Sequence, residues 1–329
     1  MRLDITPRRI VAIAAAVAGA IVYSRYCQDL RASRARVTTG SRVVPTRAGP
    51  IEYAERGFGA PVLIVHGAGG GFDQGMEMFG LLARPGLRLI AVSRFGYLRT
   101  PLPDDASPAA QADAHAALLD ALRIAAVSVV AASAGAPSAM EFAIRHPLRC
   151  QALVLVVPLA WRPAMEAPGD TVPSRLKQAL VAAVTRSNAA FWACARVAPS
   201  LLVRTVLGTP PAVVRCASTD ERHRVAAVLD HILPIDARTA GLVNEGRVAR
   251  ALERLPLERI AAPTLVVSAR DDGYDTYASG SYISSQVPGA KFIGYDAGGH
   301  LAVGHHDAML REIDRFLTLH TRRANEVNA

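Results

Sequence analysis

The sequence predicts an α/β protein whose mostly parallel sheet is covered by helices on both faces. Two observations lead to this prediction. Short, continuous apolar runs, typical of strands buried on both faces, alternate with helical patterns along most of the 329 residues. One interval of about a hundred residues, 159–262, carries helical patterns without any strand pattern. We therefore expect a helical insertion between two strands of the sheet.

The chain begins with an apolar segment. Residues 10–23 read IVAIAAAVAGAIVY and carry no charge, with Arg8 and Arg9 before them and Arg25 after them. A helix of that length rises about 21 Å, against the ~30 Å of a hydrocarbon core. We expect residues 1–36 to form a membrane anchor followed by a basic linker. A cleaved signal peptide and a buried core helix are the alternatives, and arginines on both flanks leave the side of the membrane undefined.

The expected strands follow in order and are separated by amphipathic helical stretches. One helical face carries His115, Leu118, Leu119 and Leu122, and another near the C-terminus carries Met309, Ile313, Phe316 and Leu317. We divide the body into residues 37–158 and 263–329, the two parts of the core, with 159–262 as the insertion. The strands are expected at Arg42–Thr46, Pro61–Val65, Leu87–Ser93, Val127–Ala132, Ala152–Val157, Thr264–Ser268 and Lys291–Tyr295.

Composition excludes several classes of protein. Half of the chain is apolar (51%) and 20% is charged, which excludes global disorder. Residues 1–50 hold nine Arg and two Asp, so they account for +7 of the net charge of +9. A body that binds nucleic acid would carry its basic residues itself, and we expect no such partner. The cysteines and histidines are not spaced as zinc ligands are, so no metal is expected. A disulfide between Cys194 and Cys216 is left as an alternative to free thiols.

A candidate nucleophile follows the strand Val127–Ala132. Ala131-Ala132-Ser133-Ala134-Gly135 then leads into a helical pattern. A serine on a tight strand-to-helix turn needs small neighbours two residues before and after it, as in G-x-S-x-G. Ala131 replaces the first glycine of that pattern. The alternative is that Ser133 only caps the helix.

A glycine-rich loop follows the strand Pro61–Val65. It reads His66-Gly-Ala-Gly-Gly-Gly71, and such a loop can turn backbone N–H groups toward a developing oxyanion. A phosphate loop is the other use of such glycines, but no Lys-Ser/Thr follows them. We interpret His66 as a structural residue of the turn.

Two further elements follow the last two strands of the series. Asp271 and Asp272 come after Thr264–Ser268, and Gly298-Gly299-His300 comes after Lys291–Tyr295. A carboxylate placed there can orient an imidazole, and the imidazole can act as a base for a serine. Serine, aspartate and histidine thus follow three predicted strands in that order.

These motifs together resemble the α/β-hydrolase superfamily. The H-G-A-G-G-G loop, the S-R-F-G-Y turn at Ser93–Tyr97, the A-x-S-x-G turn and the G-G-H segment match it in order and spacing over roughly residues 40–320. The resemblance implies an eight-stranded sheet with a helical cap at 159–262. It also implies Ser133 as nucleophile, His300 as base, Asp272 as acid, and the N–H groups of Ala68 and Ala134 as oxyanion donors.

The superfamily pattern G-x-x-D selects Asp272, although Ala269 stands in place of the glycine; Asp271 should then face a turn or solvent. A serine at position 133 argues against the haloalkane dehalogenase and epoxide hydrolase branches, because resemblance to those branches would require an aspartate at this position. We expect cleavage of an ester-type bond in a small, apolar substrate through an acyl-enzyme, without cofactor or metal. The alternatives are a carbon–carbon bond hydrolase of meta-cleavage products and a non-catalytic binding protein. The sequence predicts no particular oligomeric state.

Overall fold

The computed structural model describes residues 7–163 and 185–327, and its centre is one seven-stranded sheet. The order is β1-β2-β4-β5-β6-β7, with β3 paired to β2; β1 is antiparallel to β2, and β4 to β7 are parallel. This confirms the mostly parallel sheet. The strands are β1 Arg42–Thr46, β2 Gly49–Val65, β3 Pro85–Val92, β4 Val127–Ala132, β5 Cys150–Val156, β6 Thr264–Ala269 and β7 Lys291–Tyr295.

The described residues contain seven strands where the resemblance implied eight, because β2 takes two places beside β3. Residues 58–65 of β2 pair with 85–92 in ascending order, whereas residues 53–57 pair with 92–88 in descending order. Gly57 and Gly59, with φ of +83° and +122°, allow the bend. A Cβ atom at Gly59 would lie 2.4 Å from the carbonyl carbon of Gly86, so only glycine fits this close approach. The strand predicted at Pro61–Val65 is the end of the second arm, and the first arm, residues 49–57, was not predicted.

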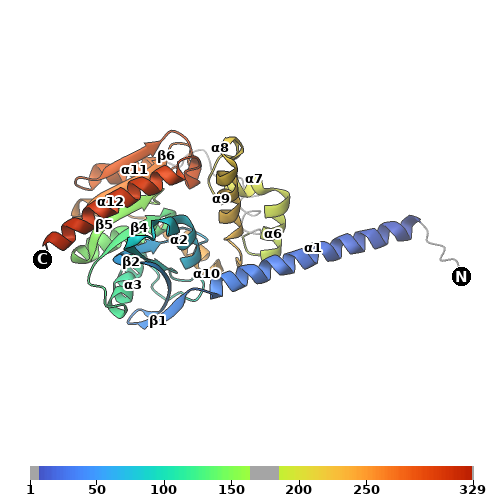
Figure 1. Cartoon of the computed structure of the whole chain (residues 1–329), viewed down its shortest axis with the longest axis horizontal. Helices are drawn as coiled ribbons and strands as arrows, with labels where there is room; N and C mark the ends of the chain where they lie inside the picture. Colours follow the sequence, from blue (N-terminus) through green and yellow to red (C-terminus); the bar gives the residue numbers. More distant parts are fainter. Residues whose placement is uncertain (1–6, 164–184, 328–329) are drawn as a thin grey trace.

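Helices cover both faces of the sheet, as expected, and each face has its own hydrophobic core (Figure 1). In β4, Val129 and Ala131 pack against the helices of one face, and Val130 and Ala132 against those of the other. Neighbouring side chains of a strand point to opposite faces, which explains why the central strand β4 is almost wholly apolar. The first face carries α3 (Pro108–Ala121), α4 (Ala136–Arg145) and α11 (Thr276–Gln286), and the second α2 (Phe72–Phe79) and α12 (His306–Val327).

The described part of the insertion, residues 159–163 and 185–262, contains helices and no strand; residues 164–184 lie outside the described residues. Phe191, Trp192 and Leu229 belong to its small hydrophobic core, together with Leu301 and Val303 from the segment after β7. The insertion therefore packs on the segment that carries His300. Its helices are α6 (Asn188–Val197), α7 (Pro199–Thr205), α8 (Pro211–Cys216), α9 (Thr219–Asp230) and α10 (Thr239–Arg250).

The N-terminal helix α1 spans Pro7–Thr38 and projects from the body (Figure 1). The end of residues 1–36, expected as a basic linker, continues this helix. The reason is tertiary: the ring centroids of Tyr26 and Trp192 are 5.6 Å apart, and the Trp192 Nε1–H donates to Asp29 Oδ2 at 2.9 Å. These contacts hold the C-terminal half of α1 against α6.

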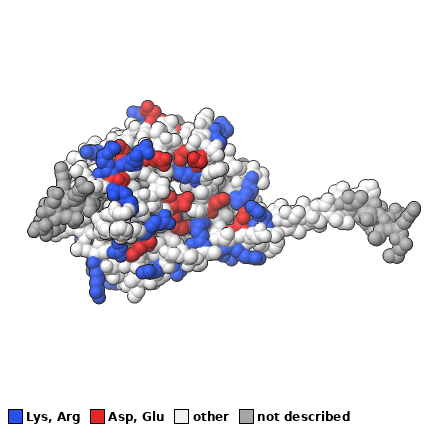
Figure 2. Space-filling model, in the orientation of Figure 1, with Lys and Arg blue, Asp and Glu red and all other residues white. Residues whose placement is uncertain are grey.

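The projecting half of α1 is apolar and exposed. Within Val11–Thr38, an 18-residue window has a mean hydropathy of 1.3, and none of that window is buried. In Figure 2 the part of α1 between its grey outer end and the body is drawn without charged side chains, whereas Lys and Arg are interspersed with Asp and Glu on the visible face of the body. All four cysteines are free thiols, so the Cys194–Cys216 disulfide is not formed.

Candidate active site

Ser133 occupies a tight turn between β4 and α4. It begins a 3-10 turn, Ser133–Gly135, and its φ of +49° lies in the left-handed region, which is costly for a residue other than glycine. A Cβ atom at Gly135 would lie 2.6 Å from the His66 carbonyl oxygen, so this position, two residues after Ser133, must be glycine. The methyl group of Ala131 is buried within the core, so the turn accommodates the alanine that replaces the first glycine.

The structure brings Ser133, His300 and Asp272 together in one chain of hydrogen bonds. His300 Nε2 lies 2.9 Å from Ser133 Oγ, and His300 Nδ1 lies 2.8 Å from Asp272 Oδ2. Each residue follows the carboxyl end of a strand, namely β4, β6 and β7. The arrangement has the geometry in which an imidazole accepts a proton from a hydroxyl group while a carboxylate holds its other nitrogen.

Two groups not singled out from the sequence fix the Asp272 carboxylate, whose side chain is fully buried. The Tyr274 N–H donates to Oδ1 at 2.8 Å, and the Thr276 hydroxyl donates to Oδ2. Ser268 Oγ lies 2.8 Å from the Thr276 hydroxyl and continues the network. Both oxygens of the buried carboxylate therefore have hydrogen-bond donors. Only their position directly after Asp272 could have indicated them in the sequence.

Asp271 faces a turn, which is one of the two surroundings expected for it. Its Oδ1 atom accepts a hydrogen bond from the Gly299 N–H at 2.7 Å. Gly299 immediately precedes His300, so Asp271 supports the turn that carries the imidazole and does not contact the imidazole itself.

The insertion covers His300 from the other side. The Tyr274 ring lies edge-on to the imidazole with 4.9 Å between centroids, and the Tyr274 hydroxyl donates to the Val206 carbonyl at 2.8 Å. The Gly208 carbonyl accepts hydrogen bonds from the N–H groups of Gly273 and His300. The segment between α7 and α8 is therefore part of the wall of the site.

The glycine-rich loop, residues 66–71, lies against Ser133. A Cβ atom at Gly67 would be 3.1 Å from the Ser133 Cβ. His66 Nε2 accepts from the Arg94 N–H at 3.0 Å, and its Nδ1 donates to the Gly67 carbonyl at 2.7 Å. Burial, and then the Arg94 charge, hold the pKa of His66 well below its ordinary value. A neutral imidazole with both nitrogens engaged stabilises the turn.

The two expected oxyanion donors flank the serine. Ala134 follows Ser133 in the 3-10 turn, and Ala68 follows Gly67 in the loop. Among the residues that the structure describes, no acceptor is bonded to the Ala68 N–H. The residues described also include no group of three or more His, Cys, Asp or Glu side chains that could bind a metal ion.

A cavity of about 500 Å³ lies between the core and α10, mostly lined by apolar side chains. A narrower space of about 30 Å³, lined by Ala134 and Leu159 among others, shares several wall residues with it. The narrower space reaches Ala134, the residue after Ser133, whereas neither Ser133 nor His300 belongs to the wall of either space. Its apolar wall includes Pro108, Pro137, Met140, Trp161, Val248 and Tyr282.

Known proteins share this architecture. Over 109 residues the chain is 39% identical to the uncharacterized hydrolase YcgS of Bacillus subtilis, a match that spans 32% of this chain and 37% of YcgS. An α/β hydrolase fold protein from Nakamurella multipartita superposes with a TM-score of 0.67 at 29% identity, over 84% of this chain and 98% of that one. A bacterial membrane phospholipase A superposes with a TM-score of 0.64 at 18% identity, over 95% and 96% of the two chains.

The family match agrees with the fold and with the arrangement of the site. Residues 60–307 match the α/β hydrolase fold family, and this range contains most of the sheet and the whole of the Ser133, Asp272 and His300 arrangement. The protein therefore belongs to the α/β-hydrolase fold family.

Proposed function

We propose that the protein is a serine hydrolase that cleaves an ester bond of a small, mainly apolar substrate through an acyl-enzyme. The observation that carries this proposal is the continuous contact from Ser133 Oγ to His300 Nε2 at 2.9 Å and from His300 Nδ1 to the buried Asp272 at 2.8 Å. A serine hydroxyl is a weak nucleophile until an adjacent base takes its proton. This geometry supplies that base and orients it.

In the proposed mechanism, His300 takes the Ser133 proton while Oγ attacks the carbonyl carbon of the ester. The N–H groups of Ala68 and Ala134 stabilise the resulting oxyanion. The tetrahedral intermediate collapses, His300 gives its proton to the departing alcohol, and Ser133 keeps the acyl group. Water, activated by His300, then releases the acid and restores the serine. Asp272 keeps the Nδ1–H tautomer and stabilises the imidazolium.

The cavity supports an apolar substrate. A volume of about 500 Å³ falls within the range of small-molecule sites, and its wall is mainly hydrocarbon and aromatic. In this proposal the apolar part of an ester occupies the cavity, and its carbonyl end points toward the narrower space lined by Ala134, the residue next to Ser133.

We also propose that α1 anchors the protein to a membrane. The support is an apolar helix near the N-terminus whose projecting half is exposed to solvent in the isolated chain. A buried core helix would instead be covered by the protein.

Hydrolysis of p-nitrophenyl acetate and longer esters tests the proposed reaction. Ser133→Ala should lower kcat by several orders of magnitude without changing the melting temperature, because it removes the nucleophile alone. A fluorophosphonate should label the wild type and spare this variant. Ser285→Ala, an exposed serine of α11, is the matched control and should behave as the wild type. Hydrolysis of a meta-cleavage product without ester hydrolysis would favour the carbon–carbon bond alternative, and equal labelling of both serine variants would contradict the nucleophile.

A further inference from the structure

Two buried ion pairs connect the core and the insertion on either side of the glycine-rich loop. Arg94, in the core turn after β3, pairs with Glu245 of α10. Arg238, directly before α10 in the insertion, pairs with Asp73 of α2 at 2.8 Å. The pairs are reciprocal, since each side contributes one arginine and one acid.

Arg94 binds backbone carbonyls on both sides of the proposed oxyanion position. Its side chain is 8% exposed. Its Nη2 atom donates to the Gly67 carbonyl at 3.2 Å, and its Nη1 atom donates to the Ala134 carbonyl at 3.2 Å. His66 Nδ1 donates to the same Gly67 carbonyl at 2.7 Å. This carbonyl oxygen therefore has two donors, one of which carries a positive charge.

The Gly67 carbonyl and the Ala68 N–H belong to one planar peptide group. Fixing the oxygen of such a group fixes the direction of its N–H. Donors on the oxygen also polarise the group, and in chains of hydrogen bonds this strengthens each bond by about 10–30%. A donor aimed in advance at a developing negative charge needs no reorganisation during the reaction. Arg94 thus acts on the Ala68 N–H from the far side of its peptide bond.

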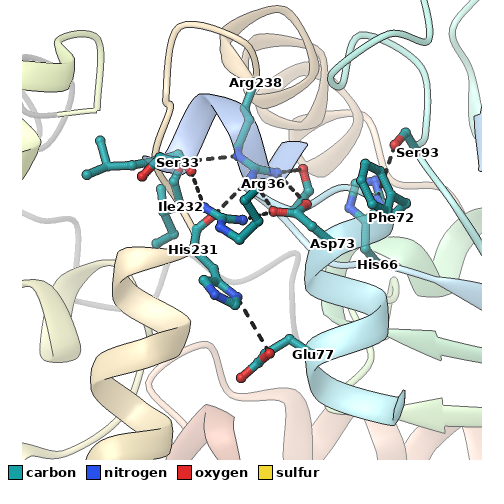
Figure 3. Close-up of polar contacts among 12 residues, drawn as sticks. Ser33, Arg36, His66, Phe72, Asp73, Glu77, Ser93, His231, Ile232 and Arg238 are labelled. Carbon is teal, nitrogen blue, oxygen red and sulfur yellow. Dashed lines mark hydrogen bonds and ion pairs between the residues drawn. The ribbon is translucent and has the colours of Figure 1, made fainter. Parts of the chain in front are cut away.

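The second pair fixes the other end of the loop. The fully buried Arg238 guanidinium donates to the Gly70 carbonyl and to the Asp73 carboxylate. Arg36 of α1 binds the same carboxylate, and Figure 3 shows Asp73 between the two arginines. Burial opposes ionisation of Asp73, but the charges of Arg238 and Arg36 outweigh it and lower the pKa of this carboxyl group. The loop is thus held at Gly67 and at Gly70.

We infer that Arg94 is a positioning residue for catalysis: held by Glu245, it aims the Ala68 N–H into the oxyanion hole and makes docking of α10 a condition for a complete hole. The inference rests on the proposed serine hydrolase function. Burial lowers the pKa of Arg94 to about 10, so it remains a cation at neutral pH. Arg94 Nε and Glu245 Oε2 are buried without partners. A buried ion pair with unsatisfied hydrogen-bonding atoms contributes little to stability. The main effect of the pair is therefore the contact of Arg94 with the glycine-rich loop.

The test replaces both charges so that neither is left buried alone. Arg94→Met with Glu245→Met should keep the melting temperature within a few degrees, since apolar residues of similar volume can replace a buried pair. kcat should fall about tenfold to a hundredfold, less than for loss of an oxyanion donor itself, while KM changes less than about threefold. Arg84→Gln with Asp314→Asn, a partly exposed pair 2.7 Å apart that joins the residue before β3 to α12, is the control and should leave kcat unchanged.

A trifluoromethyl ketone gives a readout that a merely structural residue would not change. It forms a hemiketal with the serine, and its oxygen occupies the oxyanion hole as an anion. Its inhibition constant should rise in the double variant by the same factor as kcat falls. Arg94→Lys keeps the positive charge but loses the two-pronged guanidinium, so its kcat and inhibition constant should lie between those of the wild type and the double variant. This variant also serves as the test if the double variant does not fold. Unchanged kcat and inhibition constant in the folded variants, or a loss that appears in KM alone, would overturn the inference.

The rate of fluorophosphonate labelling separates this inference from the proposed substrate class. Labelling also places a developing charge in the oxyanion hole and requires no known substrate. A wild type that hydrolyses no ester but labels faster than the double variant would contradict the ester proposal and support the role of Arg94. Ester hydrolysis with equal labelling rates in the wild type and the double variant would support the ester proposal and contradict the role of Arg94.

Discussion

The Nε2 atom of His300 lies 2.9 Å from the Oγ atom of Ser133, although 167 positions separate the two residues in the sequence. The order of the strands explains this proximity. β4, β5, β6 and β7 are neighbours and parallel, so their carboxyl ends lie along one edge of the sheet. Ser133, Asp272 and His300 follow β4, β6 and β7 at that edge.

The adjacent acids Asp271 and Asp272 should differ sharply in their effect on turnover. Asp272→Asn removes the charge that orients and stabilises the imidazole, and should lower kcat on the order of 10⁴-fold. Asp271→Asn keeps an oxygen that can accept the Gly299 N–H and should change kcat less than about tenfold. Steady-state kinetics on a p-nitrophenyl ester, with melting temperatures as the control, measure both. The opposite ranking would contradict the assignment of the acid.

The position of an N-terminal truncation should decide whether the released body is stable. Removal of residues 1–24 takes away the exposed apolar half of α1 and keeps Tyr26, Asp29 and Arg36, which contact the body. We expect this protein to be soluble and active and the full chain to sediment with membranes. Removal of residues 1–36 leaves Asp73 without one of its two arginines and should lower the melting temperature by at least about 5 °C.

Fractionation of cell extracts and thermal denaturation check these two truncations. A full-length chain recovered wholly in the soluble fraction with an intact N-terminus would contradict the anchor. Equal melting temperatures for the two truncated proteins would contradict the structural role of residues 25–36.

Stability should fall in mild acid because buried histidines are kept neutral. Burial lowers the pKa of His115 to about 3, and burial followed by Arg224 lowers that of His306 to about 4. In the unfolded chain a histidine has a pKa near 6.5. The unfolded state therefore binds more protons between these values, so this contribution to stability is complete above about pH 6.5 and is lost as the pH falls below it.

His115→Phe tests this linkage because it replaces a titrating ring with a non-titrating ring of similar size. Urea denaturation between pH 5 and 6 should show a slope of stability against pH smaller by about 1.4 kcal/mol per unit, the value for one proton. An unchanged slope would show that His115 is not buried as a neutral imidazole. Loss of its weak contact with Ser138, 3.4 Å away, affects the free energy of unfolding at every pH and not the slope.

The turn around Ser133 should tolerate change on one side only. Gly135→Ala would place a methyl group 2.6 Å and 2.8 Å from two backbone oxygens, those of His66 and Val65. Backbone atoms there must shift, so we expect a melting temperature lower by several degrees and a loss of fluorophosphonate labelling. Ala131→Gly restores the usual glycine and should label as the wild type does, with a small loss of stability from the removed buried methyl group. Normal labelling of Gly135→Ala would contradict the close packing of this turn.

Much of the fold could be read from local patterns. The predicted range Val127–Ala132 agrees with β4, because a strand buried on both faces must be almost wholly apolar. The predicted range Lys291–Tyr295 agrees with β7, a partly exposed strand at the edge of the sheet. The division of β2 around β3 could not be read in this way, since it depends on the approach of Gly59 to Gly86, 27 positions further along the chain.

The sequence by itself determined the alternation of strands and helices, the helical insertion and the three residues placed after strands, because burial and turn geometry act on neighbouring residues. Only the tertiary structure decided that residues 31–38 continue a helix, that Asp271 supports the His300 turn, and that Arg94 meets Glu245, 151 positions away. Such contacts depend on how the elements pack in space. Charged residues that find partners across an interface have the same local pattern as charged residues in solvent, so no periodicity distinguishes them until the core and the insertion are docked.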